Sequence, residues 1–528
     1  MKSHLYWIVI VYLGCANIND QNKHLGAVST ATPEATSVGI DILQNGGNAI
    51  DAAVAISFVL AVTEPAMSGL GGGTQLLVDM PERSPFMING STRSPANTPE
   101  FMESNSLEYH QRSTIPSMVK TLYYSWEKYG SGNYTWEELL EPAIEIANKG
   151  FKVGEFRAKV YNRYGERLTE SPFNSHFVLT EQGAVPEEKD VIKQETLAKT
   201  IQKLAIGGSK EFYSGGIAQE IARDMEKNGG WITYEDLAQF PDPNEITALK
   251  TTFRGYDVYT SAPPCGGWVL LVALNLLEDN ENENIKAVIE SLYSAHNDRL
   301  LNPVLDVENF DSIISKKLSE AYTDSVPQLS DADNFRDSGE TTHFSVVDGN
   351  GISVSVTASI NAYFGARAAS EKLGFLYNTY MDDFVFGEEH HPWLIGPDKM
   401  AFSSMTPTIV KKNGEPVLVL GSPGSARIIS SLTQVINNWT KSQDIVEAIN
   451  QPRIHVNRDR VYFESSTDST NYSNLIQDLG LRIGTYRKDL EVNSLNAYFG
   501  GVHAIAKENG IWIAHSDPRR DGTAESIE

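Results

Sequence analysis

The stretch Glu340-Thr341-Thr342-His343-Phe344-Ser345-Val346-Val347-Asp348 follows a polar segment rich in Ser and Asp. Its apolar/polar alternation from Phe344 to Val347 predicts a strand. If the bond between Glu340 and Thr341 is cut, Thr341 gains a free α-amino group beside its own hydroxyl. An α-amine titrates near pH ~8, so it can act as the base that an alcohol nucleophile needs. An ordinary strand start is the plainer interpretation, and the segment alone favours it because Thr is common in strands.

Composition sets the broad class of the protein. A chain of 528 residues is long enough for more than one hydrophobic centre. The formal net charge of −25 argues against a nucleic-acid partner, because such partners require clustered Lys and Arg. Only two cysteines are present, so no disulfide framework is expected. No spacing typical of a zinc site occurs, and we expect no metal.

The N-terminus predicts a leader over residues 1–20. Lys2 precedes an apolar run, Leu5 to Leu13, which is too short to span a bilayer. The small residues that follow are typical of a secretory signal peptide. Leu13-Gly14-Cys15 also resembles a degenerate lipoprotein signal with a lipid anchor at Cys15. Both alternatives predict a secreted, periplasmic or cell-envelope protein, and a cytosolic protein with an apolar start is a third.

The N-terminal part of the chain is rich in helical signals. Thr32-Pro33-Glu34 predicts a helix start, with Thr as the N-cap and Pro in the first turn. Asn48 opens a second helical segment, Ala49 to Val62, which is apolar almost all round and therefore indicates a buried helix. The glycine-rich run Gly69–Gly73 then leads into a probable strand, Gln75–Val78, and lacks the context of a nucleotide-binding loop.

Beyond Thr341 the pattern changes to hairpins. Asp348-Gly349-Asn350-Gly351, Asn413-Gly414 and Asn509-Gly510 each separate two alternating runs, which predicts three β-hairpins. Helical segments such as Ile428–Trp439 lie between them. No long linker divides the chain, so the sequence predicts an α+β protein with stacked sheets covered by helices.

Eight ordered segments between about Leu25 and Arg520 together resemble the γ-glutamyltransferase family. They are Gly46–Ala55, Thr63-Glu64-Pro65 running into Gly69–Gly73, Pro263–Gly267, Thr341–Asp348, Met381–Phe384, Ser403-Ser404-Met405, Gly421–Gly424 and Asp517-Pro518-Arg519. The resemblance implies an N-terminal-nucleophile hydrolase with a four-layer αββα sandwich. It also implies a proenzyme that cuts itself between Glu340 and Thr341. Residues 25–340 would form the large subunit and residues 341–528 an associated small catalytic subunit, without cofactor.

The resemblance also implies a mechanism. Thr341 would be both nucleophile and N-terminal base, oriented by Thr342, and would form an acyl-enzyme released by water or an amine. Backbone N–H groups at Gly424 and Ser425 would stabilise the oxyanion. The family pattern has a second glycine where this chain has Ser425, so the donor there depends on the dihedral angles that Ser can hold.

Family substrate contacts match five further residues of this chain, and a sixth, Tyr380, departs from the family pattern. Asp383 matches the acid that binds the substrate α-amino group, and its plainer alternative is a solvated Asp. Ser403 and Ser404 match two serines near the substrate α-carboxylate, or form a small-residue turn. Ser359 and Asn361 match a pair near the nucleophile, or a polar strand end. Tyr380 stands where the family often has Gln or another polar ligand.

One departure concerns an arginine that clamps the substrate carboxylate in the family. Its place here is Ser91, and a hydroxyl cannot provide the bidentate binding of a guanidinium. Arg93, two residues later, either replaces it from a shifted position or is a surface residue. This pattern is more typical of the divergent γ-glutamyltransferase-like branch.

Three functions follow as hypotheses. The first is a self-cleaving γ-glutamyltransferase or glutathione hydrolase that acts on a small γ-glutamyl amide. The second is the same chemistry on another acyl donor, such as an acylated β-lactam side chain, oxamate or a γ-linked polymer. The third is a non-catalytic member of the fold.

Overall fold

The computed structural model describes residues 26–173, 175–278, 284–304, 307, 309–319, 322, 339–391, 393–486 and 488–527. The predicted leader with Cys15 lies outside the described residues, as does the polar segment before Gly339. Within the described ranges, no helix combines the length and the apolar character that crossing a membrane requires.

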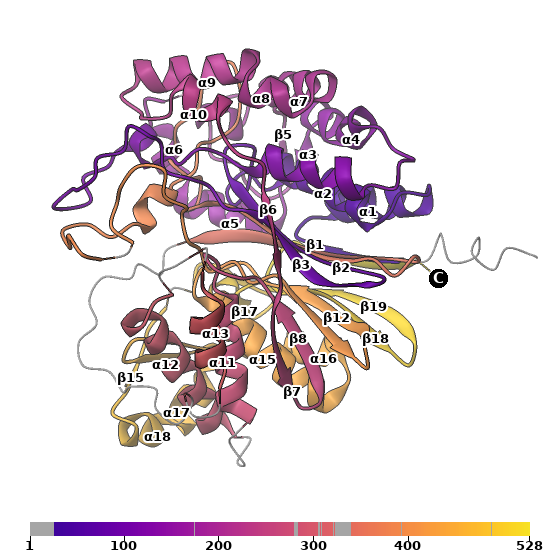
Figure 1. Cartoon of the computed structure of the whole chain (residues 1–528), viewed down its shortest axis with the longest axis vertical. Helices are drawn as coiled ribbons and strands as arrows, with labels where there is room; N and C mark the ends of the chain where they lie inside the picture. Colours follow the sequence, from indigo (N-terminus) through magenta and orange to yellow (C-terminus); the bar gives the residue numbers. More distant parts are fainter. Residues whose placement is uncertain are drawn as a thin grey trace, which may run out of the picture.

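Two antiparallel sheets stack at the centre of the molecule (Figure 1). The first has the strand order β20 (Thr523–Ile527), β1 (Gly26–Thr30), β9 (Glu340–Asp348), β10 (Ser353–Asn361), β2 (Gly73–Met80), β3 (Arg83–Gly90) and β6 (Asn244–Thr247). The second has the order β19 (Ile511–Ser516), β18 (His503–Glu508), β12 (Glu415–Gly421), β11 (Thr408–Lys412), β8 (Tyr256–Thr260) and β7 (Leu249–Phe253).

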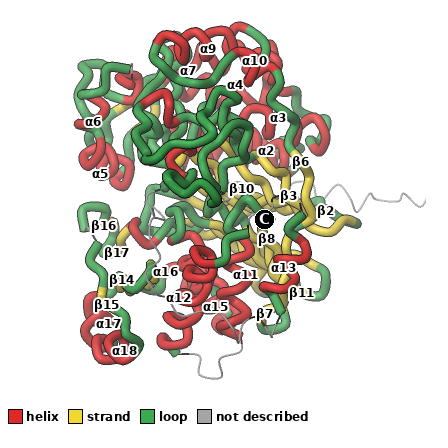
Figure 2. The backbone as a smooth tube through the Cα atoms, turned by 60° about the vertical axis from the view of Figure 1, so that its left-hand side comes forward, coloured by secondary structure: helices red, strands yellow, loops and turns green. Residues whose placement is uncertain are grey.

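Helices cover the outer face of each sheet, as both Figure 1 and the turned view in Figure 2 show. The upper layer in Figure 1 contains α1 (Pro33–Gln44), α2 (Ala49–Thr63), α3 (Met118–Tyr129), α4 (Trp136–Lys149), α5 (Glu155–Tyr164), α6 (Glu166–Thr169), α7 (Glu195–Gly207), α8 (Ser209–Tyr213), α9 (Gly216–Lys227) and α10 (Tyr234–Ala238). The lower layer contains α11 (Gly267–Glu278), α12 (Ile285–Leu301), α13 (Asp311–Lys317), α15 (Arg427–Ser442), α16 (Ile445–Asn450), α17 (Ser466–Asn471) and α18 (Ser473–Asp478). The four-layer αββα sandwich is therefore confirmed.

Short elements connect and flank these layers. They are β4 (Phe151–Lys152), β5 (Val191–Ile192), β13 (Ile454–Asn457), β14 (Arg460–Phe463), β15 (Arg482–Ile483), β16 (Glu491–Val492), β17 (Leu495–Asn496), and the 3-10 turns η2 (Tyr109–Arg112), η3 (Ser175–Val178), η4 (Tyr380–Asp383) and η5 (Ala497–Phe499).

Strand β9 is buried along its whole length because it is covered on both faces. Val346 packs into the hydrophobic core beneath the upper helices, and its neighbour Val347 packs into the core shared with the second sheet. Successive side chains of a strand point to opposite faces, so two adjacent valines contribute to two different cores. Polar pairs also cross between the sheets, since Ser345 Oγ donates to the carbonyl oxygen of His503 at 3.0 Å.

The predicted helix signals are confirmed. Thr32 caps α1, and its hydroxyl accepts a hydrogen bond from the Ala35 N–H. Asn48 caps α2 and forms a capping box with Asp51. Every residue of α2 is buried, which explains why this helix is apolar on all sides rather than on one stripe.

The three predicted hairpins are also confirmed, as β9–β10, β11–β12 and β18–β19. In the second, Asn413 and Gly414 have φ values of 53° and 85°. In the third, Asn509 and Gly510 have φ values of 51° and 85°. Positive φ at both central residues is the requirement of a type I′ turn, which Asn-Gly meets at low cost.

The strands of both sheets come from both sides of the 340/341 bond. In the first sheet, β9 lies between β1 and β10 and pairs with both. In the second, β8 precedes this bond in the chain and pairs with β11, which follows it. The predicted large and small subunits would thus each contribute strands to both central sheets.

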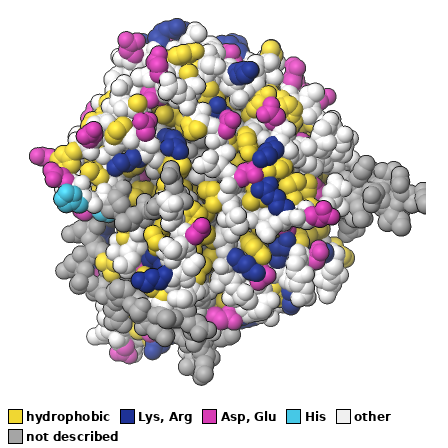
Figure 3. All heavy atoms as spheres, in the orientation of Figure 1, with side chains coloured by type: hydrophobic (Ala, Val, Ile, Leu, Met, Phe, Trp, Pro, Cys, Tyr) yellow, Lys and Arg dark blue, Asp and Glu magenta, His cyan; other side chains and the backbone are white. Residues whose placement is uncertain are grey.

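Charged side chains are mixed on the face of the molecule shown in Figure 3, where Lys and Arg lie singly or in small groups among Asp and Glu. This distribution suits a chain with 43 basic and 68 acidic residues.

Candidate active site

Thr341 is the second residue of β9, and only 6% of it is exposed. Its Oγ1 accepts a hydrogen bond of 3.2 Å from the backbone N–H of Gly424. Gly424 belongs to the turn that joins β12 to α15. This turn therefore brings backbone N–H groups to the hydroxyl that sequence analysis singles out.

Ser425 occupies the left-handed region of the backbone, with φ of 54°. Gly424 before it has φ of 119°, which only glycine adopts without strain. A serine pays a cost for its dihedral angle, yet it holds the conformation and lines the same pocket as Thr341. The departure from the family pattern at Ser425 is thus accommodated by the backbone.

Two buried arginines hold the side chain of Glu340, the residue before Thr341. Its Oε1 lies 2.6 Å from Nη2 of Arg427, and its Oε2 lies 3.1 Å from Nη2 of Arg520. Arg427 opens α15, and Arg520 follows β19. All three side chains are buried, so this paired carboxylate fixes the chain immediately ahead of the 340/341 bond.

A bulge at the end of β10 positions Ser359 and Asn361. The pairing of β10 with β9 shifts between Ala358 and Asn361, and Asn361 has φ of 71°. Bulges re-aim side chains near functional sites. Here the Ser359 hydroxyl donates to the carbonyl oxygen of Glu340 at 2.6 Å and accepts from the Asn361 N–H at 2.7 Å.

One pocket, the catalytic pocket hereafter, gathers most of the residues predicted from the sequence. The predicted residues that line it are Thr341, Ser359, Asn361, Tyr380, Asp383, Ser403, Ser404 and Ser425. They come from β9, from the bulge after β10, from η4, from the loop before β11 and from the β12–α15 turn. Their roles remain predictions, but the fold places them around one small space beside the Thr341 hydroxyl.

Asp383 is partly exposed to this pocket, but protein atoms surround its carboxyl group. The resulting desolvation raises its pKa to about 7, while a hydrogen bond from Asn361 and the charge of Arg299 oppose the rise. A carboxyl group with such a pKa changes its charge near neutral pH. Before an ammonium group binds, the carboxylate that can pair with it is therefore the major form only above about pH 7.

Arg93 does not lie in the catalytic pocket. Its Nη1 donates to the backbone oxygen of Asp398 at 3.3 Å, and it lines two other cavities. Ser91 is also elsewhere, since its hydroxyl donates to Asn89 Oδ1 at 2.7 Å and accepts from Gln75 Nε2 at 3.0 Å. Neither residue reaches the place where Ser403 and Ser404 lie.

Arg299 is the arginine at that place, and sequence analysis misses it. It belongs to α12, and only 4% of it is exposed. Its Nη1 donates to Ser404 Oγ at 2.7 Å, and its Nη2 donates to the Ser403 carbonyl oxygen at 3.3 Å. In the sequence Arg299 is only the last of four consecutive polar residues, His296 to Arg299, and their burial becomes visible only in the structure.

Thr342 lies beneath the site, with 1% of the residue exposed. Its hydroxyl interacts with the side chain of Glu64. Burial raises the pKa of Glu64 to about 7, against the effects of the Arg520 charge and of the hydrogen bond with Thr342. The orienting role predicted for Thr342 stays a prediction.

Comparison with known proteins gives consistent matches. The sequence model of the family described as Gamma-glutamyltranspeptidase matches residues 35–527. The glutathione hydrolase proenzyme of Escherichia coli (strain K12) is 34% identical over 475 residues, which cover 81% of this chain and 80% of that protein. The proenzyme of the same name from Bacillus subtilis (strain 168) is 30% identical, with 95% and 91% covered.

Among solved structures, the cephalosporin acylase from Bacillus halodurans has the same fold, with a TM-score of 0.83, 23% identity and 96% of each chain covered. The ordered motifs, the four-layer sandwich and these matches agree, and the chain belongs to the γ-glutamyltranspeptidase family.

Proposed function

We propose that this protein is a self-cleaving γ-glutamyltransferase and glutathione hydrolase that forms a γ-glutamyl-enzyme on Thr341. The observation that carries the proposal is the contact between Thr341 Oγ1 and the Gly424 N–H, beside a pocket that contains Asp383, Ser403 and Ser404. A nucleophile, an N–H donor for an oxyanion and polar groups for an amino acid then meet in one place.

Self-cleavage begins with attack of Thr341 Oγ1 on the carbonyl carbon of Glu340. The hydrogen bond from Ser359 to the Glu340 carbonyl oxygen polarises this group and stabilises the developing negative charge. The peptide C–N bond breaks, an ester forms on Thr341, and the proton of the Thr341 hydroxyl passes to the leaving nitrogen. Water hydrolyses the ester, which leaves a carboxylate on Glu340 and an α-amine on Thr341.

Turnover repeats acyl transfer with the new α-amine as the base. Thr341 Oγ1 attacks the γ-amide carbonyl of the substrate, and the leaving amine takes a proton. The backbone N–H groups of Gly424 and Ser425 stabilise the tetrahedral oxyanion. Water or an acceptor amine then releases the acyl group. The predicted leader supports a secreted or cell-envelope location.

A second candidate is an amidase of the same mechanism that acts on a different acyl donor. The observation that favours it is the position of Ser91, which bonds to Asn89 and Gln75 away from the catalytic pocket. If the unaltered protein does not cleave glutathione and the Ser91→Arg variant does, this second candidate would be supported.

Purified protein tests the proposal directly. We expect two bands on a denaturing gel, Thr341 as the N-terminus of the smaller fragment, and release of glutamate from glutathione and of 4-nitroaniline from γ-glutamyl 4-nitroanilide. Cleaved protein that turns over neither substrate would defeat the proposal. One uncut band without activity would favour a non-catalytic member of the fold.

The charge of Asp383 predicts a pH dependence. Because its pKa is about 7, the carboxylate is mostly protonated at pH 6 and cannot pair with the substrate ammonium group. We expect kcat/KM for γ-glutamyl 4-nitroanilide, divided by that for glutaryl 4-nitroanilide, to rise about tenfold from pH 6 to pH 8. Glutaryl lacks the α-amino group, so the ratio cancels the titration of the Thr341 amine.

In Asp383→Asn the same ratio should be low and independent of pH. A ratio that is flat in the unaltered enzyme would show that Asp383 does not pair with the amino group.

A further inference from the structure

A second cavity of about 260 Å³ lies beside the catalytic pocket. Arg299 and Phe402 line both spaces, so they form the wall between them. The catalytic pocket itself is much smaller, at about 30 Å³. The larger cavity approaches the size of ordinary small-molecule sites, which begin at about 300 Å³.

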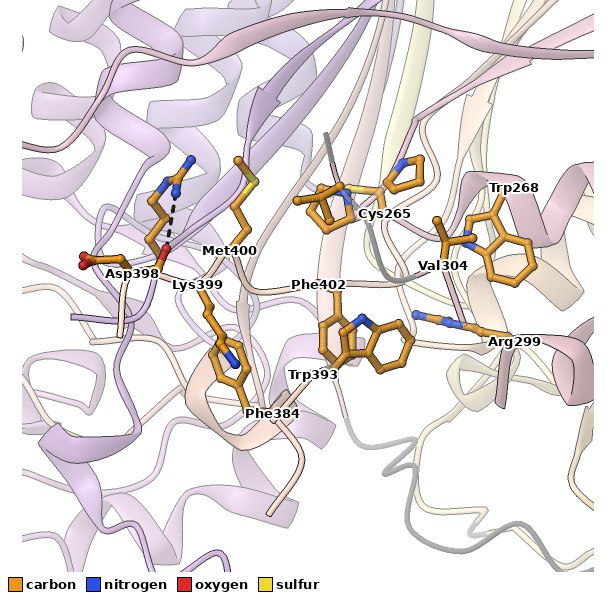
Figure 4. Close-up of a pocket in the computed structure, with 14 residues that line it drawn as sticks. Cys265, Trp268, Arg299, Val304, Phe384, Trp393, Asp398, Lys399, Met400 and Phe402 are labelled. Atoms are coloured by element: carbon orange, nitrogen blue, oxygen red, sulfur yellow. Dashed lines mark hydrogen bonds between the residues drawn. The ribbon is translucent and has the colours of Figure 1, made fainter. Parts of the chain in front are cut away.

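Aromatic rings form one side of this cavity. The rings of Trp393 and Phe402 are stacked with their centroids 3.8 Å apart, and Phe384 meets Phe402 edge-on at 6.4 Å. Figure 4 shows Trp393 and Phe402 midway along the cavity, with Trp268 at the end where Arg299 lies. Flat rings arranged in this way offer stacking surface to a planar group.

Basic side chains outnumber acidic ones among the described residues that line the cavity. Three basic side chains, those of Arg93, Arg299 and Lys399, line it, against one acidic side chain, Asp398, among the described lining residues. In Figure 4 the Asp398 carboxylate points away from the other labelled side chains. Lys399 Nζ donates a hydrogen bond of 2.7 Å to the backbone oxygen of Leu394. Because this partner is neutral, the bond does not compensate the charge of the ammonium group.

The position of the cavity indicates which end of a substrate it faces. Thr341 and Ser425, where the amide bond is broken, line the catalytic pocket and are absent from the described lining of the cavity. The cavity lies instead on the other side of Arg299 and Phe402, which line both spaces, and Arg299 contacts Ser403 and Ser404. A group that extends from the catalytic pocket into the cavity is thus the far end of the acyl chain and not the leaving amine.

We propose that the cavity is a second acyl subsite, which takes the planar, carboxylate-bearing distal part of an acyl donor longer than glutamyl. The planar part stacks on Trp393, and the carboxylate pairs with Lys399 and Arg93. Arg299 lies where the acyl chain passes from one space to the other. The inference rests on the proposed acyl transfer to Thr341.

Matched acyl anilides test the subsite in the self-cleaved enzyme. The donors are the 4-nitroanilides of 4-(4-carboxyphenyl)butanoic acid and of 4-phenylbutanoic acid, which differ only in the distal carboxylate. We expect kcat/KM to be about tenfold or more higher for the carboxylated donor, the scale of a hydrogen-bonded charge pair. This preference should fall toward one in Lys399→Met and in Arg93→Met.

Lys149→Met is the matched control, because Lys149 is an exposed lysine on α4 far along the chain from the cavity residues. It should keep the full preference. Self-cleavage of each variant shows that it has folded. Equal turnover of the two donors by the unaltered enzyme would overturn the subsite, and so would an undiminished preference in both cavity variants.

Assays with γ-glutamyl 4-nitroanilide separate the two levels of the proposal. If this short donor is turned over while the carboxylate preference is absent, only the second subsite is wrong. If cleaved protein turns over none of the three anilides, the acyl transfer itself is wrong and the subsite falls with it.

Discussion

Thr341→Ala should yield a single uncut chain without measurable activity. The substitution removes the hydroxyl that attacks Glu340. The 340/341 bond therefore stays intact, and no α-amine is released at residue 341. Loss of a catalytic nucleophile costs up to about 10⁶-fold in kcat. Mass spectrometry of the purified variant, together with turnover of γ-glutamyl 4-nitroanilide, measures both effects.

Thr341→Ser is the matched control, because it retains the hydroxyl and loses only the methyl group that restricts χ1. It should still cut itself, more slowly, and end with Ser at the new N-terminus. A Thr341→Ala protein that is found cut at 340/341, or that turns over the anilide, would contradict the assignment of Thr341 as nucleophile.

Arg520→Met should produce the second large effect, on both stability and self-cleavage. Arg520 and Arg427 share the buried carboxylate of Glu340. Arg427 remains beside Glu340 in this variant, so we expect a loss below the ~3–5 kcal/mol that a fully unpaired buried charge costs. Glu340 also shifts, and a displacement of ~1 Å at a reacting group slows reaction about 100-fold.

The two effects require two backgrounds. Thermal midpoints are compared in Thr341→Ala protein, where every chain stays whole, and half-times of cleavage are compared in protein that retains Thr341. Arg520→Lys, which keeps a positive charge beside Glu340, should lose less stability than Arg520→Met. Arg520→Met protein with the parent midpoint and the parent half-time would show that the Glu340 contacts contribute nothing.

Local signals in the sequence predict much of the fold. The Asn-Gly turns set three hairpins, and the Thr32 and Asn48 caps set the first two helices, because each depends only on residues that are close in sequence. The all-round apolar character of α2 correctly indicates burial on every side. The four-layer arrangement followed from the family resemblance rather than from these patterns.

The arginines of the site escape such reasoning. Arg299 reaches Ser404 across 105 residues of sequence, and Arg520 reaches Glu340 across 180. No periodicity or spacing connects residues so far apart, since only the packing of the layers brings them together. Arg93 shows the converse: it is close in sequence to the place of the expected carboxylate ligand, yet its side chain faces another cavity.

Both central sheets contain strands from both sides of residue 340, and this has a consequence for the lifetime of the enzyme. A whole chain folds as one molecule, at a rate that does not depend on how much protein is present. If the 340/341 bond is cut, two fragments that share both central sheets must find each other in solution before either sheet can form, so their reassembly becomes a second-order process that dilution suppresses. Once cut, the protein therefore stays folded because its unfolding is slow, and not because its fragments refold readily.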